Sequence, residues 1–155
     1  MRAVIQRVSR SEVLSNGTLT GHTEIGLVVL LGIRHGDAEE DADKLAKKIA
    51  NLRIFSDEND KLNKSVNDVN GSVLVVSNFT LYANYAHGNR PDYFESEEPV
   101  RANELYEYFV NALRPLVPGI STGIFGADMK ISMENDGPIT IVMDSEILTG
   151  KGSKK

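Results

Sequence analysis

The run of ten residues from Ser72 to Leu81 constrains the fold of this chain more than any other segment. It is rich in β-branched residues, and positions 73–76 read Val-Leu-Val-Val without a polar interruption. A strand that is apolar on both faces is typical of the middle of a sheet. We therefore expect residues 72–81 to form a long central strand.

Other strands follow from shorter patterns. The longest apolar stretch, 26–33, has the length of a buried strand. Residues 2–8 indicate a first strand, and Asn16-Gly17 predicts a tight hairpin turn before a second one. Further strand-like runs occupy 52–55, 120–125, 129–134 and 139–143.

Two helices are expected between these strands. The sequence Asp-Ala-Glu-Glu at 37–40 resembles a capping box, and apolar residues then recur at helical spacing as far as Leu52. A second helix is expected over 100–114, before Pro115. Because strands cluster instead of alternating with helices, we predict an α+β fold: mainly antiparallel β-sheets, two helices packed on one side, and a single domain. The domain should span 1–148, followed by a disordered tail at 149–155.

Composition excludes several kinds of function. The 155 residues contain no cysteine, so there is no thiol nucleophile, disulfide or thiolate zinc site. The histidines at 22, 35 and 87 lack metal-ligand spacing, and we expect neither a metal nor another cofactor. A net charge of −5 argues against non-specific binding of DNA or RNA, but not against brief contact with one RNA end. No stretch predicts a signal peptide or a membrane span, so a cytoplasmic location is expected.

The segment 77–81, Ser-Asn-Phe-Thr-Leu, ends the expected central strand. On a strand, Asn78 and Thr80 would point to the same face. A threonine hydroxyl is a poor nucleophile without a base, and no histidine or lysine lies close in the sequence. Thr80 is therefore either a catalytic residue or a threonine that suits a strand.

Two further segments allow a functional and a structural interpretation. Gly137-Pro138 is either an ordinary turn or a cis peptide whose neighbouring carbonyls accept hydrogen bonds from an ammonium group. The sequence Phe-Gly-Ala-Asp-Met at 125–129 either forms a β-bulge or leaves room for a flat ligand such as a nucleobase. Asp128 and Asp136 both lie in turn-like contexts, where aspartate is common. Together these segments indicate a site built from main chain and small polar side chains.

In order along the chain, these segments resemble the D-aminoacyl-tRNA deacylase family, also called D-tyrosyl-tRNA(Tyr) deacylases. The family signatures Ser-Gln-Phe-Thr-Leu and Asn-x-Gly-Pro-x-Thr/Val are similar to 77–81 and 135–140. Residues 1–8, 51–55 and 125–129 also resemble the family, and the resemblance extends to about Asp144. One departure is Asn78, where the family usually has the longer glutamine. The loop 85–91 also has fewer basic residues than is typical.

The resemblance implies an enzyme that hydrolyses the ester bond of D-aminoacyl-tRNA, and also of glycyl-tRNA mischarged on tRNA(Ala). It implies a homodimer that binds the 3′ end of the aminoacyl-tRNA. The carbonyls of Gly137 and Pro138 from one subunit would hold the substrate's ammonium group in the other, where an L side chain would collide with them. Arg7 resembles the arginine that supports this segment.

The remaining site residues are also implied by the resemblance. Backbone N–H groups at Phe79 and Thr80 would stabilise the oxyanion, beside Ser77 and Asn78, while the 2′-hydroxyl of the tRNA assists the chemistry. The wall of the terminal-adenosine pocket would be formed by Phe125, Gly126, Ala127 and Met129. Two alternatives stay open: a tRNA deacylase with relaxed chirality, and an RNA-end or nucleotide-binding module without turnover.

Overall fold

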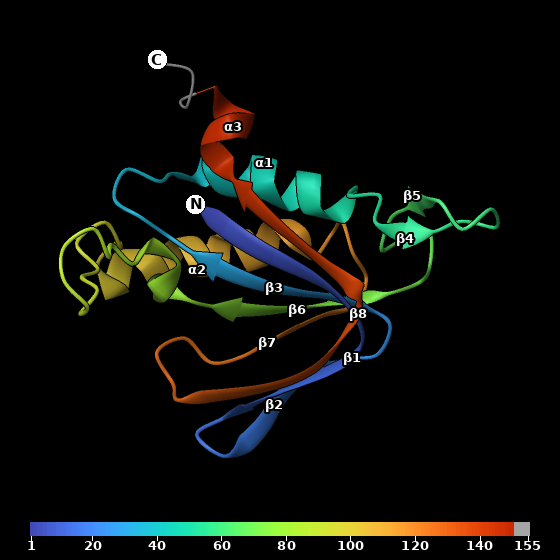
Figure 1. Ribbon diagram of the computed structural model, residues 1–155, viewed down its shortest axis with the longest axis horizontal. Helices are drawn as coiled ribbons and strands as arrows, with labels where there is room; N and C mark the ends of the chain where they lie inside the picture. The colour runs from blue at the N-terminus through green and yellow to red at the C-terminus, as the bar shows by residue number, and fades with distance from the viewer. Residues whose placement is uncertain (151–155) are drawn as a thin grey trace.

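A computed structural model describes residues 1–150, which form a six-stranded mixed sheet, a two-stranded ribbon, three α-helices and a short 3-10 turn (Figure 1). The strands are β1 (Arg2–Ser15), β2 (Thr18–Thr23), β3 (Gly26–Gly32), β4 (Phe55–Ser56), β5 (Leu62–Lys64), β6 (Ser72–Ser77), β7 (Ile120–Thr122) and β8 (Met129–Asp144). The helices are α1 (Glu39–Ala50), α2 (Pro99–Leu113) and α3 (Ser145–Thr149), and the 3-10 turn is η1 (Phe79–Tyr82).

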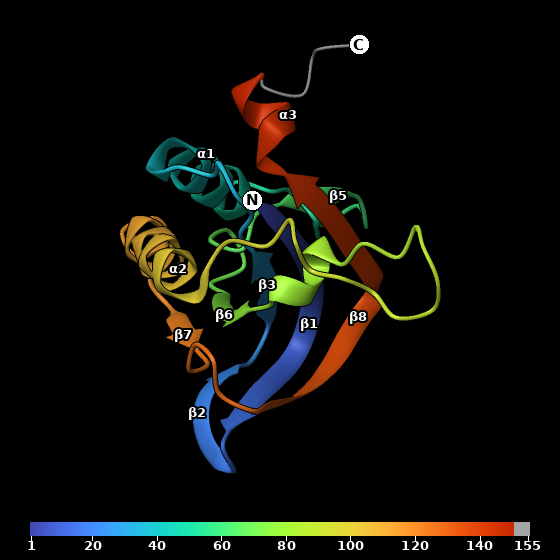
Figure 2. The same ribbon diagram turned by 90° about the vertical axis from the view of Figure 1, so that its left-hand side faces the viewer.

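The sheet has the order β2-β1-β3-β6-β7, and β8 pairs with β1. The pairs β1–β2, β1–β3 and β1–β8 are antiparallel, as is the ribbon β4–β5, whereas β3–β6 and β6–β7 are parallel. Helices α1 and α2 lie together on one side of the sheet (Figure 2). The predicted α+β fold with two helices on one side is therefore confirmed.

Strands β3 and β6 are buried on both faces, as their apolar sequences predict. One face of the pair, with Val29 and Val75, belongs to the main core under α1 and α2. The opposite face, with Val28 and Leu74, belongs to a second cluster, against which Met129 and other apolar residues of β8 pack. Because β1 and β8 are long and curl over, they cover a face that the helices cannot reach (Figure 1).

The predicted central strand is wrong in its last part, because β6 ends at Ser77 and η1 follows. The Asn78 N–H makes a final bond to the Leu31 carbonyl, and the chain then turns. The turn buries Tyr82, whose ring lies 5.1 Å from the Arg2 guanidinium carbon and 5.9 Å from that of Arg34. Burial of this ring, together with its two cation–π contacts, outweighs the strand propensity of the sequence.

Several other boundaries also differ from the sequence-based expectations. Helix α1 begins at Glu39, and its first turn is capped by Asp41, whose carboxylate accepts from the Ala38 N–H at 3.0 Å. The expected capping role of Asp37 is wrong, because its carboxylate binds the α-amino group of Met1 and the Arg34 N–H.

Two expected strand boundaries also change. The expected strand 52–55 is reduced to β4, and the runs 129–134 and 139–143 are parts of the single strand β8.

The Asn16-Gly17 hairpin is confirmed, since both residues have positive φ, at 50° and 82°. At the other end of the chain, Thr149 ends α3 and Gly150 caps it with a φ of 73°, whereas 151–155 of the expected tail lie outside the described residues. Among residues 1–150, no helix has both the length and the apolar character that a membrane crossing requires.

Candidate active site

A cavity of about 400 Å³ opens where the parallel strands β3 and β6 end. The carboxyl ends of parallel strands are a common place for ligands, because the chain leaves the sheet there and frees backbone groups. Its wall comes from four parts of the chain: β3, the end of β6, the start of α2 and the β7–β8 loop. The lining residues are Leu31, Ile33, Ser77, Asn78, Phe79, Glu97, Pro99, Ala102, Phe125, Gly126 and Met129.

The wall of this cavity is mostly apolar. The Phe125 ring packs 5.9 Å from that of Tyr106 in the core, and the Phe79 ring meets Tyr93 edge-on at 5.0 Å. Gly126 has a φ of 77°, a conformation that favours glycine and keeps this part of the wall without a side chain. Apolar walls with a few polar groups are typical of sites for small organic ligands.

The cavity gathers six of the residues singled out in the sequence: Ser77, Asn78, Phe79, Phe125, Gly126 and Met129. Ala127 is not among the lining residues, and its N–H instead closes a turn on the Ile124 carbonyl at 3.2 Å. Sequence reasoning missed Leu31, Ile33, Glu97, Pro99 and Ala102. The only sequence signal for the last three was the long irregular loop that precedes Pro99, because loops of that length are often functional.

Thr80 lies in η1 beside the cavity and is exposed. Its hydroxyl donates to the side-chain oxygen of Asn78 at 2.5 Å. The predicted common strand face of these two residues is therefore wrong, but the turn still brings their side chains together. Among residues 1–150, no histidine, lysine or carboxylate is hydrogen-bonded to Thr80, so the structure provides no activating base for the hydroxyl.

The backbone at Phe79 and Thr80 presents donors instead. These are the first two residues of a helical turn, and the first N–H groups of such a turn find no acceptor within it. The Ser96 hydroxyl donates to the Phe79 carbonyl at 3.0 Å and ties the turn to the loop before α2. The turn can therefore offer N–H groups to an oxygen that acquires negative charge.

The second signature forms an outward bulge in the middle of β8. Gln6 pairs with Thr140 and Val8 with Asn135, so the four residues 136–139 face only Arg7 on β1. The Gly137–Pro138 peptide within the bulge is cis, and both residues are exposed. Gly137 has a φ of 132°, and a Cβ there would lie 2.8 Å from the Ile139 side chain. A glycine is therefore required at this position.

Arg7 and Asn135 hold the bulge from inside. The Arg7 guanidinium donates to the Asp136 carbonyl at 3.1 Å and to the Ile54 carbonyl at 3.0 Å, and its side chain is only 11% exposed. The Asn135 amide donates to the Ile139 carbonyl at 3.1 Å, across the base of the bulge. The Arg7 guanidinium thus joins β8 to the segment before β4, although the two are distant in sequence.

Within one chain, the bulge and the cavity lie far apart. The register places Ser77 beside Leu31 and Leu31 beside Ala3, whereas the bulge lies opposite Arg7. The bulge is therefore displaced from Ser77 by four residues along the strands, which is about 13 Å, and by three strand spacings across the sheet, which is about 14 Å. In Figure 1 the bend of β8 is at one end of the molecule, and the turn after β6 is at the other.

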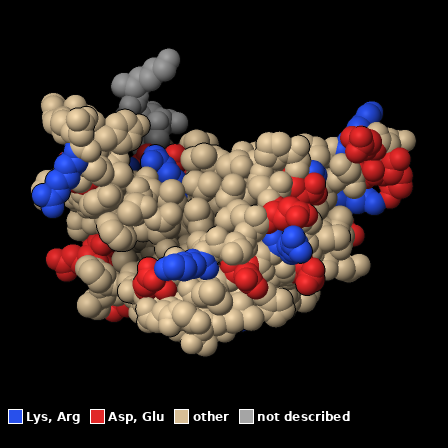
Figure 3. All heavy atoms as spheres, turned by 60° about the horizontal axis from the view of Figure 1, so that its bottom comes forward, with Lys and Arg blue, Asp and Glu red and all other residues tan. Residues whose placement is uncertain are grey.

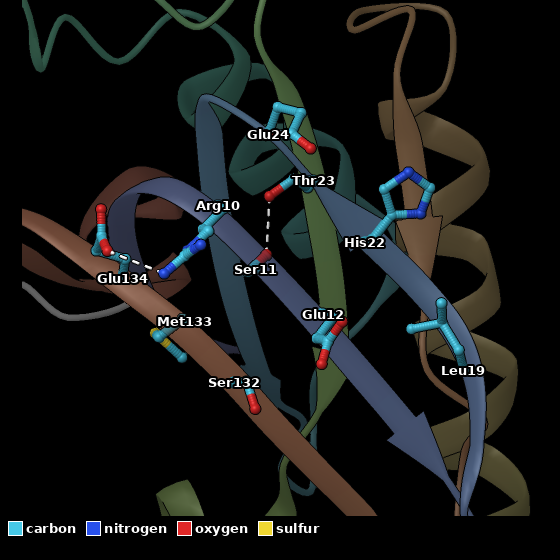
Figure 4. Close-up of a pocket in the computed structure, with 10 residues that line it drawn as sticks. All are labelled: Arg10, Ser11, Glu12, Leu19, His22, Thr23, Glu24, Ser132, Met133 and Glu134. Atoms are coloured by element: carbon cyan, nitrogen blue, oxygen red, sulfur yellow. Dashed lines mark hydrogen bonds and ion pairs between the residues drawn. The ribbon is translucent and has the colours of Figure 1, made fainter.

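A larger hollow of about 580 Å³ lies on the curled part of β1, β2 and β8 (Figure 4). Four of its polar side chains are paired with one another: Ser11 is hydrogen-bonded to Thr23 at 2.8 Å, and Arg10 lies 3.5 Å from a Glu134 oxygen. None of the predicted site residues lines it. We therefore place the candidate active site in the smaller cavity, where the signature segment and the free backbone donors meet.

The net charge of −5 does not favour broad binding of nucleic acid. On the face shown in Figure 3, basic and acidic side chains are interspersed in a large uncharged area. Within residues 1–150, no group of three or more histidine, aspartate or glutamate side chains is arranged to hold a metal ion. The site is thus a small apolar cavity beside backbone donors. The cavity suits binding of one flat organic group, and the donors suit an acyl-transfer reaction.

Comparison with known proteins agrees with this class of site. The family model for D-Tyr-tRNA(Tyr) deacylase matches residues 4–144. A D-aminoacyl-tRNA deacylase of Aquifex aeolicus is 54% identical over 94% of this chain and 98% of its own length. One from Paracoccus denitrificans is also 54% identical, over 94% and 97%.

Two solved structures share the fold. A c-Myc DNA unwinding element binding protein superimposes with a TM-score of 0.87 at 38% identity, covering 93% of this chain and 98% of the other. A probable eukaryotic D-amino acid tRNA deacylase superimposes with a TM-score of 0.78 at 15% identity, which shows the fold alone. The chain belongs to the D-Tyr-tRNA(Tyr) deacylase family. The predicted family is confirmed, and with it the predicted enzyme class, a hydrolase acting on ester bonds.

The contacts of Arg7 lead to a prediction about the bulge. Arg7→Lys should lower the free energy of unfolding by about 1–3 kcal/mol, because a single ammonium cannot hold both carbonyls that the guanidinium reaches. Arg10→Lys is the matched control, since Arg10 has a side chain that is 75% exposed and pairs with Glu134; its effect should stay within about 0.5 kcal/mol. Urea unfolding measures both, and equal effects would show that Arg7 does not hold the bulge.

Proposed function

We propose that this protein hydrolyses the ester of D-aminoacyl-tRNA and binds the 3′-terminal adenosine in the cavity beside η1. One observation carries the proposal: an apolar cavity for a flat group opens next to backbone donors, and among residues 1–150 no base is hydrogen-bonded to the neighbouring Thr80 hydroxyl. A substrate that brings its own hydroxyl group would need no such base. The names of the relatives agree, since two of them are D-aminoacyl-tRNA deacylases. The expected place of action is the cytoplasm, where charged tRNA is used.

The reacting groups are the ester carbonyl of the substrate, a water molecule and the 2′-hydroxyl of the RNA, and the protein supplies backbone N–H donors. The ester carbonyl oxygen receives hydrogen bonds from the N–H groups of Phe79 and Thr80 as it becomes an oxyanion. The 2′-hydroxyl of the terminal ribose takes a proton from the attacking water and passes one to the departing 3′-oxygen. The bond between the carbonyl carbon and the 3′-oxygen breaks, which releases a free amino acid and tRNA.

The Gly137–Pro138 segment belongs to a site on a second copy of the chain. It lies about 13 Å along the strands and about 14 Å across them from the cavity of its own chain. It is exposed and held outward by Arg7, so it is available to another subunit. We therefore propose a homodimer in which the carbonyls of this segment bind the substrate's ammonium group.

This arrangement would select the substrate by chirality. With the ammonium and the ester carbonyl both held, an L side chain points into the Gly137–Pro138 segment, whereas a D side chain points away from it. Glycine has no side chain to exclude, so glycyl-tRNA mischarged on tRNA(Ala) would also be hydrolysed. Selection by exclusion requires a segment that does not move aside, and the hydrogen bonds of Arg7 and Asn135 serve that purpose.

Matched D-tyrosyl-, L-tyrosyl- and glycyl-tRNA test the function directly. We expect fast loss of the D-tyrosyl and glycyl esters while the L-tyrosyl ester stays intact, measured as release of labelled amino acid by the purified protein. Hydrolysis of D- and L-tyrosyl esters at similar rates would instead show a deacylase with relaxed chirality. If all three esters bind without turnover, the protein is an RNA-end binding module and the proposal fails.

Removal of the Thr80 hydroxyl tests the chemical step. Thr80→Ala should keep activity within about tenfold of the parent, because the hydroxyl has no base and only donates to Asn78. Thr80→Ser, which keeps the hydroxyl, is the control. In the same assay, a substrate ending in 2′-deoxyadenosine should react at least about a hundredfold more slowly. A loss of about a thousandfold in Thr80→Ala alone would identify a true nucleophile.

Mixing two inactive variants tests the shared site. Gly137→Val displaces the bulge, and Phe79→Asp places a charge in the cavity wall. Phe79 is 59% exposed and does not belong to the core, so this change should leave the fold intact. Refolded together in equal amounts, half of the dimers are mixed and each has one intact site of two, so activity should return to about a quarter of the parent. If both segments act within one subunit, the mixture stays inactive.

A further inference from the structure

The cavity wall contains one ionisable side chain among the described residues that line it, Glu97. It lies just before α2, and its side chain is only 14% exposed. Most of the wall that it shares, including Ile33, Ala102 and Phe125, is apolar. A carboxylate in such a wall is partly shielded from water, and a ligand that displaces the remaining water must offer a hydrogen-bond donor in its place.

One oxygen of Glu97 is satisfied within the protein. Oε1 accepts from the Glu98 N–H at 2.9 Å and lies 3.0 Å from His35 Nδ1. The backbone is held as well, because the Glu97 N–H donates to the Ile33 carbonyl at 3.0 Å. These three contacts fix both the position and the orientation of the carboxylate.

The other oxygen, Oε2, has no hydrogen-bond or ion-pair partner among residues 1–150. Ser77 and Asn78 are the remaining residues of the wall with polar side chains, and the Asn78 oxygen already accepts from Thr80. The cavity therefore offers a fixed, negatively charged acceptor to whatever fills it. A ligand that matches it has a flat apolar body and an N–H donor at its edge.

We propose that Glu97 accepts a hydrogen bond from the exocyclic amino group of the terminal adenine, and that it thereby selects adenine over bases with a carbonyl at the same position. Adenine carries an amino group where guanine and hypoxanthine carry an oxygen. That oxygen would face Oε2 with both lone pairs, and neither group has a proton to share. The inference rests on the proposed function, since it takes adenosine to be the occupant of the cavity.

The test uses D-tyrosyl esters of three nucleosides: adenosine, purine riboside, which lacks the amino group, and inosine, which carries an oxygen in its place. The parent should prefer adenosine over purine riboside by about tenfold in kcat/KM, and over inosine by about a hundredfold. Glu97→Gln should reduce both preferences and improve inosine relative to the parent, because the glutamine amide can donate to the oxygen.

Glu98→Gln is the matched control, because Glu98 is the exposed neighbour and does not line the cavity. It should leave the ratios among the three esters unchanged. Thermal unfolding of both variants shows whether either change disturbs the fold. His35→Gln adds a second readout: it should weaken the adenosine preference partly, since Oε1 loses the partner that orients the carboxylate.

The possible outcomes separate this inference from the function itself. If the parent hydrolyses none of the three esters and no D-aminoacyl-tRNA, the proposed function fails. If the parent hydrolyses the adenosine ester and folded Glu97→Gln keeps the parent's ratios, Glu97 does not read the base and this inference is overturned. A parallel loss on all three esters in folded Glu97→Gln would likewise overturn it, because base selection changes ratios and not the common rate.

Discussion

The parallel pairing of β3 with β6, buried on both faces, is the interaction on which the rest of the structure depends. Gly26 at its start lies so close to β6 that an added Cβ would be 1.8 Å from the Ser72 carbonyl oxygen. Because both faces are apolar, one must be covered by α1 and α2 and the other by the curled ends of β1 and β8. The candidate site lies where this pair ends, so its backbone donors follow directly on two strands that are buried on both faces.

A second constraint is the separation of the two signature segments. The bulge of β8 lies opposite Arg7, level with the start of β3, whereas the chain leaves β6 beside the end of β3. No rotation of side chains bridges that separation. Under the proposed function, the two segments would meet between two copies of the chain, and the chemistry would depend on the positions of backbone groups.

Much of this protein could be predicted from local sequence. The Asn16-Gly17 turn, both main helices and the central position of 73–76 were correct, because each depends on neighbours in the chain or on a clear apolar pattern. The errors arose where distant groups compete. Strand propensity favoured β-structure as far as Leu81, but burial of Tyr82 under Arg2 and Arg34 turns the chain after Ser77. Asp37 was expected to cap a helix, yet it binds the α-amino group of Met1 instead.

By itself, the sequence determined the class of the fold, the family and the identity of six residues in the cavity wall, because these reside in local patterns and in motifs read in order. Only the tertiary structure decided that Glu97 shares a wall with Phe125, that the Thr80 hydroxyl is hydrogen-bonded to Asn78, and that Arg7 holds the Gly137–Pro138 bulge far from the cavity. The physical reason is that Glu97 and Phe125, and Arg7 and the bulge, belong to distant segments placed by strand register and core packing, while the turn that brings Thr80 to Asn78 forms because Tyr82 packs against Arg2 and Arg34.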